Sequence, residues 1–199
     1  MRAVTIQRAF QNPAREQQAV FRTVMEAMSK PGRILRLEAG FTPPAPLGAA
    51  AAAILLTLAD FETPIWLDGD LSRDAAVTAF LRFHTGARIV ASPNMAVFAL
   101  AGDSRNAPPP AAFAQGTPGY PDLSTTVIYQ VEELQSRGWR LAGPGINGEI
   151  AFGAFPLPAD FGAQLASNRS GCPLRVDMIF AGRNEVVALP RSARLVEPS

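Results

Sequence analysis

The sequence predicts one α/β domain over residues 1–199, with a mixed central sheet flanked by helices. Three observations predict this class. In the first half of the chain, segments with apolar residues at helical spacing alternate with short strand-like segments. In the second half strand patterns predominate, and a hairpin adds antiparallel pairing. The length is typical of a single domain, and no linker divides the chain.

The first predicted helix begins at Asn12 and Pro13, because an amide side chain caps a helix and proline is favoured at its first position. Apolar residues at helical spacing over 20–28 continue this helix, and the segment 30–32, Lys-Pro-Gly, ends it. Residues 33–38 alternate between apolar and polar side chains, which predicts a strand.

An alanine-rich run at 47–59 predicts a buried helix, and residues 64–68 predict a strand after it. Ser72 is expected to cap the next helix, over 73–84. Gly86 stands just beyond that helix, at the position where a left-handed residue is favoured.

Proline and glycine are frequent over 106–122, which predicts an ordered loop or a docking segment. A polar turn is expected at 136–138, between two strands. The other elements predicted in this part of the chain are strands at 88–91, 96–100, 125–131 and 139–143, a helix near 158–168, and a hairpin that pairs 175–182 with 185–190.

The composition excludes several classes of protein. The net charge is +1 and no block of like charges occurs, so neither nucleic acid nor a membrane surface is indicated as a partner. The apolar run at 47–59 is shorter than the roughly 20 residues that span a bilayer, and the start of the chain does not resemble a signal peptide. Cys172 is the only cysteine, so no internal disulfide forms, no metal site is expected, and this residue is interpreted as a small buried side chain. We therefore expect a cytoplasmic protein.

His84 is the only histidine and lies in the last turn of the helix predicted over 73–84. A histidine at this position interacts favourably with the helix dipole and with exposed carbonyl groups, which supports a structural role. A catalytic role is the alternative, and it requires an orienting carboxylate or a nucleophile nearby. Arg82, two residues earlier, is a candidate for helping to bind an anion.

The motif GPGING at 143–148 matches the glycine pattern of dinucleotide-binding loops, but it fails the test of context. A long helix should follow the loop, whereas the next residues contain a glycine and two prolines. Pro144 also lacks the backbone N–H that would bind a phosphate. We interpret the motif as a tight loop after an edge strand. The carboxylates that flank the strand at 64–68, which are Asp60, Glu62, Asp68 and Asp70, fit a Mg²⁺ site, an acid–base pair or capping of turns.

Five segments, in this order, resemble the H-subunit family of the bacterial carbon–phosphorus lyase system (PhnH). They are FRTVMEAMSKPG (21–32), LLTLADFETPIWL (55–67), LRFHTGA (81–87), GPGI (143–146) and VALPRSA (187–193). Together they extend over nearly the whole chain. Two positions depart from the family pattern: Arg175 stands where glycine is expected, and Ser192 stands where threonine is usual.

The resemblance implies the topology of fold-type I pyridoxal-phosphate enzymes without the cofactor. A Schiff base needs a lysine, and the only lysine, Lys30, lies in a turn that ends a helix. The resemblance also implies a homodimer in isolation and a core assembly with the G, I and J subunits. That assembly joins methylphosphonate to C1 of the ribose of ATP and releases adenine, giving ribose 1-methylphosphonate 5-triphosphate.

Three functional hypotheses follow. In the first, the chain is an assembly subunit of this transferase complex and has no self-sufficient active site. In the second, it contributes Arg82, His84 and Arg191 to a composite site for nucleotide or phosphonate, since guanidinium groups bind phosphate oxygens in pairs. In the third, it is a free-standing nucleotide-dependent enzyme built on GPGING.

Overall fold

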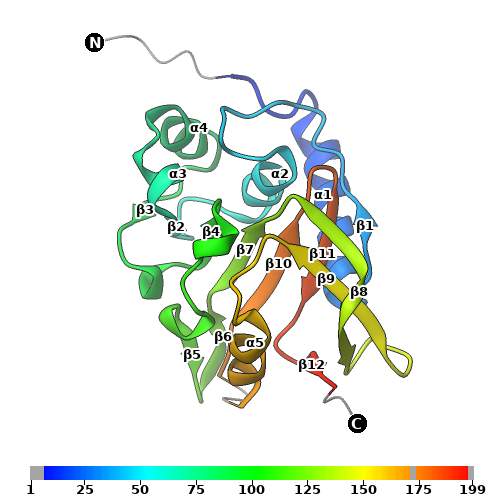
Figure 1. Ribbon diagram of the computed structural model, residues 1–199. Coiled ribbons are helices and arrows are strands. Elements are labelled where there is room, and N and C mark those ends of the chain that lie inside the picture. Colours follow the sequence, from blue (N-terminus) through cyan, green and yellow to red (C-terminus); the bar gives the residue numbers. More distant parts are fainter. Residues whose placement is uncertain (1–6, 171–173, 197–199) are drawn as a thin grey trace.

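The computed structural model describes residues 7–170 and 174–196, and it has a seven-stranded mixed sheet at its centre (Figure 1). The strand order is β1-β11-β10-β7-β4-β2-β3. Strands β10, β7, β4, β2 and β3 run parallel, whereas β11 is antiparallel to both of its neighbours. The bounds are β1 Leu35–Arg36, β2 Ile65–Leu67, β3 Ile89–Val90, β4 Phe98–Ala101, β7 Thr126–Gln130, β10 Asp177–Ala181 and β11 Glu185–Leu189. The predicted α/β class with a mixed central sheet is confirmed.

Helices α1 (Pro13–Ser29), α2 (Ala49–Leu58), α3 (Gly69–Arg73) and α4 (Ala75–Thr85) precede or connect the first strands of this sheet. The Asn12 side chain accepts a hydrogen bond from the Arg15 N–H, so the predicted start of α1 is confirmed. Gly86 ends α4 in the left-handed region, at φ 72°, as predicted. Among the described residues, no helix has the length and hydrophobicity needed to cross a membrane.

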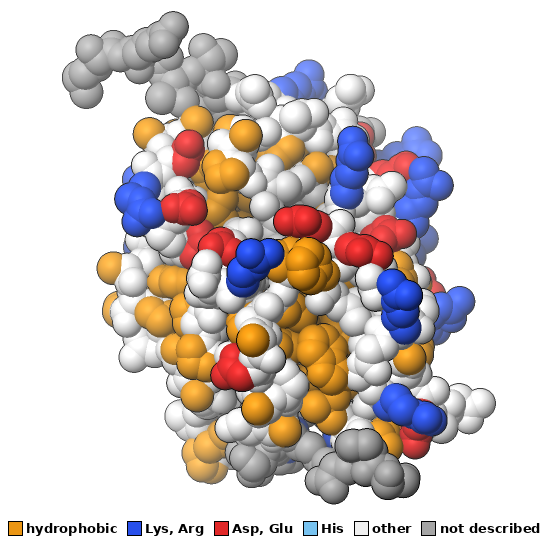
Figure 2. Space-filling model, viewed as in Figure 1, with side chains coloured by type: hydrophobic (Ala, Val, Ile, Leu, Met, Phe, Trp, Pro, Cys, Tyr) orange, Lys and Arg blue, Asp and Glu red, His pale blue; other side chains and the backbone are white. Residues whose placement is uncertain are grey.

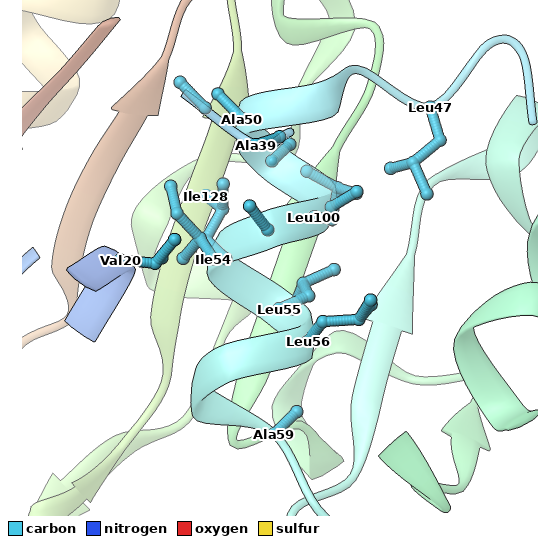
Figure 3. Packing of buried hydrophobic residues seen from close by; sticks show 14 of the residues in the cluster. Val20, Ala39, Leu47, Ala50, Ile54, Leu55, Leu56, Ala59, Leu100 and Ile128 are labelled. Atoms are coloured by element: carbon cyan, nitrogen blue, oxygen red, sulfur yellow. The ribbon is translucent and has the colours of Figure 1, made fainter. Parts of the chain in front are cut away.

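Helix α2 is buried on all sides, as its uniformly apolar sequence predicts. Figure 3 shows Ile54 of α2 close to Ile128 of the sheet and to Val20 of α1. The small alanine side chains of α2 let it pack closely against α1, and α1 and α4 both contact it. One core cluster therefore fills the space between these helices and the sheet.

The other side chains of the central strands form a second core cluster, under a three-stranded sheet and helix α5 (Phe161–Ser170). The small sheet has the order β12-β8-β9, with bounds β8 Glu133–Ala142, β9 Ile150–Phe155 and β12 Arg194–Leu195. Tyr129 and Phe180 stack at the centre of this cluster, with ring centroids 5.2 Å apart. Phe152 and Phe161 pack on Phe180 from β9 and α5.

Four predictions about local structure are wrong. Ser72 does not cap a helix: Asp68 caps the short α3, and Asp74 caps α4 by accepting from the Ala76 and Val77 N–H groups. Strand 33–38 shortens to Leu35–Arg36, because only these two residues pair with β11. The helix predicted over 20–28 is present: Val20, Val24 and Ala27 form the packed face of α1, and Phe21 and Met25 are exposed.

The remaining two differences concern loops. The expected turn at 136–138 lies inside β8, where the register against β9 shifts between Gln135 and Trp139, so this polar segment is an irregularity within one long strand. Strand β8 is also the middle strand of its sheet, so the GPGING loop does not follow an edge strand. The proline-rich segment 106–122 contains short 3-10 turns and then enters a hairpin of β5 (Gln115–Thr117) and β6 (Tyr120–Ser124). The hairpin predicted between β10 and β11 is confirmed.

Candidate functional site

His84 attaches the N-terminal segment to the end of α4. Its Nε2 atom lies 3.0 Å from the Gln7 carbonyl oxygen. The imidazole also contacts two rings of its own helix edge-on, Phe80 at 4.6 Å and Phe83 at 5.1 Å between centroids. The bonded carbonyl therefore belongs to another segment, whereas the sequence suggested the carbonyls at the end of α4. These contacts give His84 a structural role.

A cavity of about 280 Å³ lies beside His84, between the N-terminal segment, α1 and α2. Phe10, Pro13 and Leu56 give it apolar walls, and Arg8 lies at its edge. Gln17 crosses from α1 to donate a hydrogen bond to the Leu56 carbonyl at 2.8 Å. Arg82 does not line this cavity: it is exposed in the last turn of α4 and forms no ion pair with the described residues.

Arg191 is held by Asp177 at the opposite edge of the fold. The Asp177 carboxylate accepts from the Arg191 backbone N–H at 2.7 Å, from Nη2 at 2.7 Å and from Nε at 3.3 Å. Arg191 Nη1 donates to the Pro121 carbonyl of β6. Arg175 is buried next to this pair, and its Nη1 donates to the Arg191 carbonyl at 2.9 Å. The donors of Arg191 are thus directed at the protein itself.

The three sequence-predicted residues do not form one site. Arg82 and His84 lie on α4, whereas Arg191 follows β11, and Figure 1 places α4 and the segment between β11 and β12 at opposite ends of the molecule. Cys172 lies outside the described residues.

Two of the acidic residues around β2, Asp60 and Asp68, stabilise turns. Asp68 accepts from the Leu71 N–H with one carboxylate oxygen and from the Asp103 N–H with the other, which ties the segment after β2 to the segment after β4. Asp60 accepts from the Glu62 N–H and from the Thr63 hydroxyl. No cluster of three or more metal-ligating side chains occurs in the described part of the chain. Capping of turns accounts for Asp60 and Asp68, and Asp70 forms an ion pair with Arg73 at 2.6 Å.

Tyr129 is a buried polar group that the sequence did not single out. Its hydroxyl finds no hydrogen-bond partner among the described residues, and burial raises the pKa of the phenol well above its ordinary value of 10.0. The phenol stays protonated in the apolar cluster beneath β8 and β9. Its neighbours there are the Phe161 and Phe180 rings, so the residue is a packing element that carries an unsatisfied hydroxyl.

A cleft that the sequence did not predict lies between the end of α1 and the β8–β9 turn. Its volume is about 350 Å³, and it is lined by Lys30, Pro31 and Arg33 on one side and by residues 145–147, 149 and 150 on the other. Sequence spacing alone could not have joined segments more than 100 residues apart. The available signal was that both segments, ending in SKPG and containing GPGI, carry the family resemblance.

Lys30 itself does not stand in a buried cofactor pocket. Its ammonium group is about half-exposed and pairs with Glu26 at 2.8 Å, one helical turn earlier. The expectation that this fold carries no pyridoxal phosphate stays a prediction.

Comparison with known proteins connects this fold to phosphonate metabolism. Residues 8–196 match the model of the family described as bacterial phosphonate metabolism protein (PhnH). The chain is 40% identical to the alpha-D-ribose 1-methylphosphonate 5-triphosphate synthase subunit PhnH of Rhizobium meliloti (strain 1021), over 94% of both chains. It is also 29% identical to a putative C-P lyase subunit protein, HtxG, of Stutzerimonas stutzeri, over 92% of this chain and 87% of that protein.

Proposed function

The chain belongs to the PhnH family of bacterial phosphonate metabolism proteins, and from this premise we propose that it is a subunit of ribose 1-methylphosphonate 5-triphosphate synthase in the carbon–phosphorus lyase pathway. The observation that carries the proposal is the 40% identity to the Rhizobium synthase subunit over 94% of both chains. By the family resemblance, the synthase joins methylphosphonate to C1 of the ribose of ATP, with adenine as the leaving group.

Within that complex, the chain acts as an assembly subunit. His84 and Arg191 support this role because their polar atoms are engaged by Gln7, Asp177 and Pro121 of the same chain. Large apolar side chains that remain exposed support it as well, since exposed apolar surface is typical of interaction sites. They are Phe21, Met25, Phe61, Phe83, Met95, Val97, Tyr120, Leu123 and Phe155.

Several of these exposed side chains are neighbours. Phe21 and Met25 lie one turn apart on α1, where they face outward beside the buried Val20 and Val24. Phe61 approaches Gly86 at the end of α4, the helix that carries Phe83. In Figure 2, hydrophobic side chains also gather over the left and centre of the face shown. We propose that the G, I and J subunits cover such surfaces, and that the isolated chain, as a cytoplasmic protein, pairs with a second copy.

A composite site is the second candidate. Arg82 favours it, because this exposed guanidinium forms no ion pair with the described chain and is free to reach a ligand held by another subunit. Arg82→Gln and His84→Gln in the assembled synthase separate the two roles. A composite site requires turnover to fall by orders of magnitude while the complex stays intact, whereas the assembly role requires turnover per complex to persist. The fold-type I topology likewise remains a proposal, supported by the seven-stranded mixed sheet.

Reconstitution tests the proposed function. The other synthase subunits are combined with ATP and methylphosphonate, with and without this chain, and the triphosphate product is followed by phosphorus NMR and adenine release by chromatography. We expect both products only when the folded chain is present. An equal amount of chemically unfolded chain is the control. Full turnover in the absence of the chain would contradict the proposal.

A further inference from the structure

We propose that the cleft between the end of α1 and the β8–β9 turn binds the triphosphate group of ATP or of a ribose 5-triphosphate. The inference rests on the proposed function for the identity of the ligand, and on the cleft itself for the site. We name this site the Lys30–Gly145 cleft. It is lined by Lys30, Pro31, Arg33, Gly145, Ile146, Asn147, Glu149 and Ile150.

The walls of the cleft are fixed against each other by close backbone packing. A Cβ atom at Gly145 would lie 2.1 Å from the Ser29 carbonyl oxygen and 2.9 Å from Pro31 Cδ, so only glycine permits this approach. Gly32 is in turn packed against Ile150 and Leu141 of the β8–β9 hairpin. Its N–H donates to the Ala188 carbonyl of β11. The two segments therefore form a preorganised site, which reduces the entropy lost when a ligand binds.

The charges around the cleft favour an anion. Arg33 lines it and forms no side-chain hydrogen bond or ion pair with the described residues, so its guanidinium is available to a ligand. Lys30 adds a second positive charge on the same wall, with Glu26 as its partner. Glu149 is the acidic residue on the opposite wall, and Arg140 neutralises it through an ion pair.

The basic side chains of the cleft also act on Glu26. The Lys30 hydrogen bond and charge, with a smaller effect from Arg33, hold the pKa of the Glu26 carboxyl below its ordinary value of 4.5.

The opposite wall supplies neutral donors. The backbone N–H groups of Gly145 and Asn147 have no acceptor among the described residues, whereas the Ile146 N–H is used by the Gly143 carbonyl. Free N–H groups in a glycine-containing turn are suited to phosphate oxygens. Pro31, Ile146 and Ile150 provide an apolar surface for the carbon atoms of a sugar. A volume of about 350 Å³ lies within the range of small-molecule sites.

This combination selects a polyphosphate over a dinucleotide. Two cations on one wall match several phosphate charges close together, and guanidinium groups bind phosphate oxygens bidentately. The helix that a dinucleotide loop requires is replaced by strand β9, so no helix N-terminus faces the site. The carbonyl end of α1 also lies at the cleft, so the cations must provide the attraction against this negative end of the helix.

Isothermal titration calorimetry on the full chain tests the proposal, with ATP, inorganic tripolyphosphate and adenosine as separate titrants. We expect ATP and tripolyphosphate to bind and adenosine to give no heat. Loss of Arg33 in Arg33→Gln should weaken ATP binding by about tenfold or more, the change expected for one charge-assisted hydrogen bond. Lys30→Gln should weaken it in the same direction. If ATP binds and tripolyphosphate does not, the triphosphate is not what the cleft recognises.

Arg22→Gln is the matched control. Arg22 is an exposed arginine on α1, it lies outside the cleft, and its substitution changes the net charge equally. Binding in this variant should match the wild type. No heat from millimolar ATP, or equal weakening in the Arg22 and Arg33 variants, would overturn the proposal. Failure here, with the chain still required for synthase turnover, would leave the proposed function intact and remove only this site.

Discussion

Removal of the Asp177 carboxylate should destabilise the fold strongly, because the carboxylate holds Arg191 at the edge of the central sheet. The Asp177 side chain is 12% exposed and that of Arg191 is 27% exposed, so the ion pair is largely withdrawn from water. Three donors of Arg191 lose their acceptor when Asp177 is replaced by alanine. Arg175, buried beside them, then adds positive charge without compensation from Asp177.

The magnitude follows from the burial of the pair. Breaking a buried ion pair on one side costs about 3–5 kcal/mol, and the partial exposure of Arg191 places Asp177→Ala near the lower end, at about 3 kcal/mol. For a chain of this size, each kcal/mol lowers the melting temperature by roughly 2–4 °C, so a decrease of about 6–12 °C is expected. Asp177→Asn keeps an acceptor for the Arg191 N–H but loses the charge, so its loss should be smaller.

Urea unfolding followed by tryptophan fluorescence measures these changes, with Arg191→Ala and the double variant completing a cycle. We expect a coupling free energy of about 1–3 kcal/mol between the two side chains. A loss below about 1 kcal/mol for Asp177→Ala would refute the structural role of Arg191, since exposed ion pairs contribute no more than this. In that event Arg191 would return as a candidate ligand-binding residue.

Three further variants test other parts of the account. Tyr129→Phe removes a buried hydroxyl that has no hydrogen-bond partner among the described residues. The variant should therefore have a free energy of unfolding about 1 kcal/mol higher, measured by urea unfolding. A clear decrease would indicate a hydrogen bond at this hydroxyl. His84→Ala should lower the free energy of unfolding by about 1 kcal/mol, because the contacts with Gln7 and Phe80 are lost. Synthase turnover should fall only as far as assembly of the complex does. An intact complex with turnover reduced by orders of magnitude contradicts the structural role. Gly145→Ala should cost about 2–4 kcal/mol, because the added Cβ meets the Ser29 carbonyl and φ is +82°; an unchanged melting temperature in calorimetry would show that the cleft walls are not in close contact.

Local signals in the sequence predicted local structure well. Asn12 and Pro13 mark the start of α1, and Gly86 marks the end of α4, because capping chemistry depends on a few adjacent residues. The apolar character of 47–59 likewise predicted a helix buried on all sides. By contrast, the polar segment 136–138 was predicted to be a turn, since the pairing of β8 with β9 that holds it in a strand is not local.

The candidate site was harder to predict from the sequence, because the contacts that form it are also not local. Arg191 is bound by Asp177 and Pro121, which lie 14 and 70 positions away in sequence, so its engagement could not be predicted from spacing. The Lys30–Gly145 cleft joins the end of α1 to the β8–β9 turn through a contact at Gly145. GPGING was judged against the dinucleotide motif and rejected, correctly as to the missing helix, but its actual neighbour across the cleft depends on tertiary packing.

Native mass spectrometry tests the central claim most directly, that this chain is a subunit which functions by assembly. The chain is measured alone and after mixing with the G, I and J subunits of the carbon–phosphorus lyase system. The account predicts that the chain enters a stoichiometric complex with these subunits. A variant with Phe21→Ser and Met25→Ser, two side chains that are exposed on α1, tests whether that surface contributes to the complex. A chain that stays separate from all three subunits under conditions where they associate with one another would contradict the account.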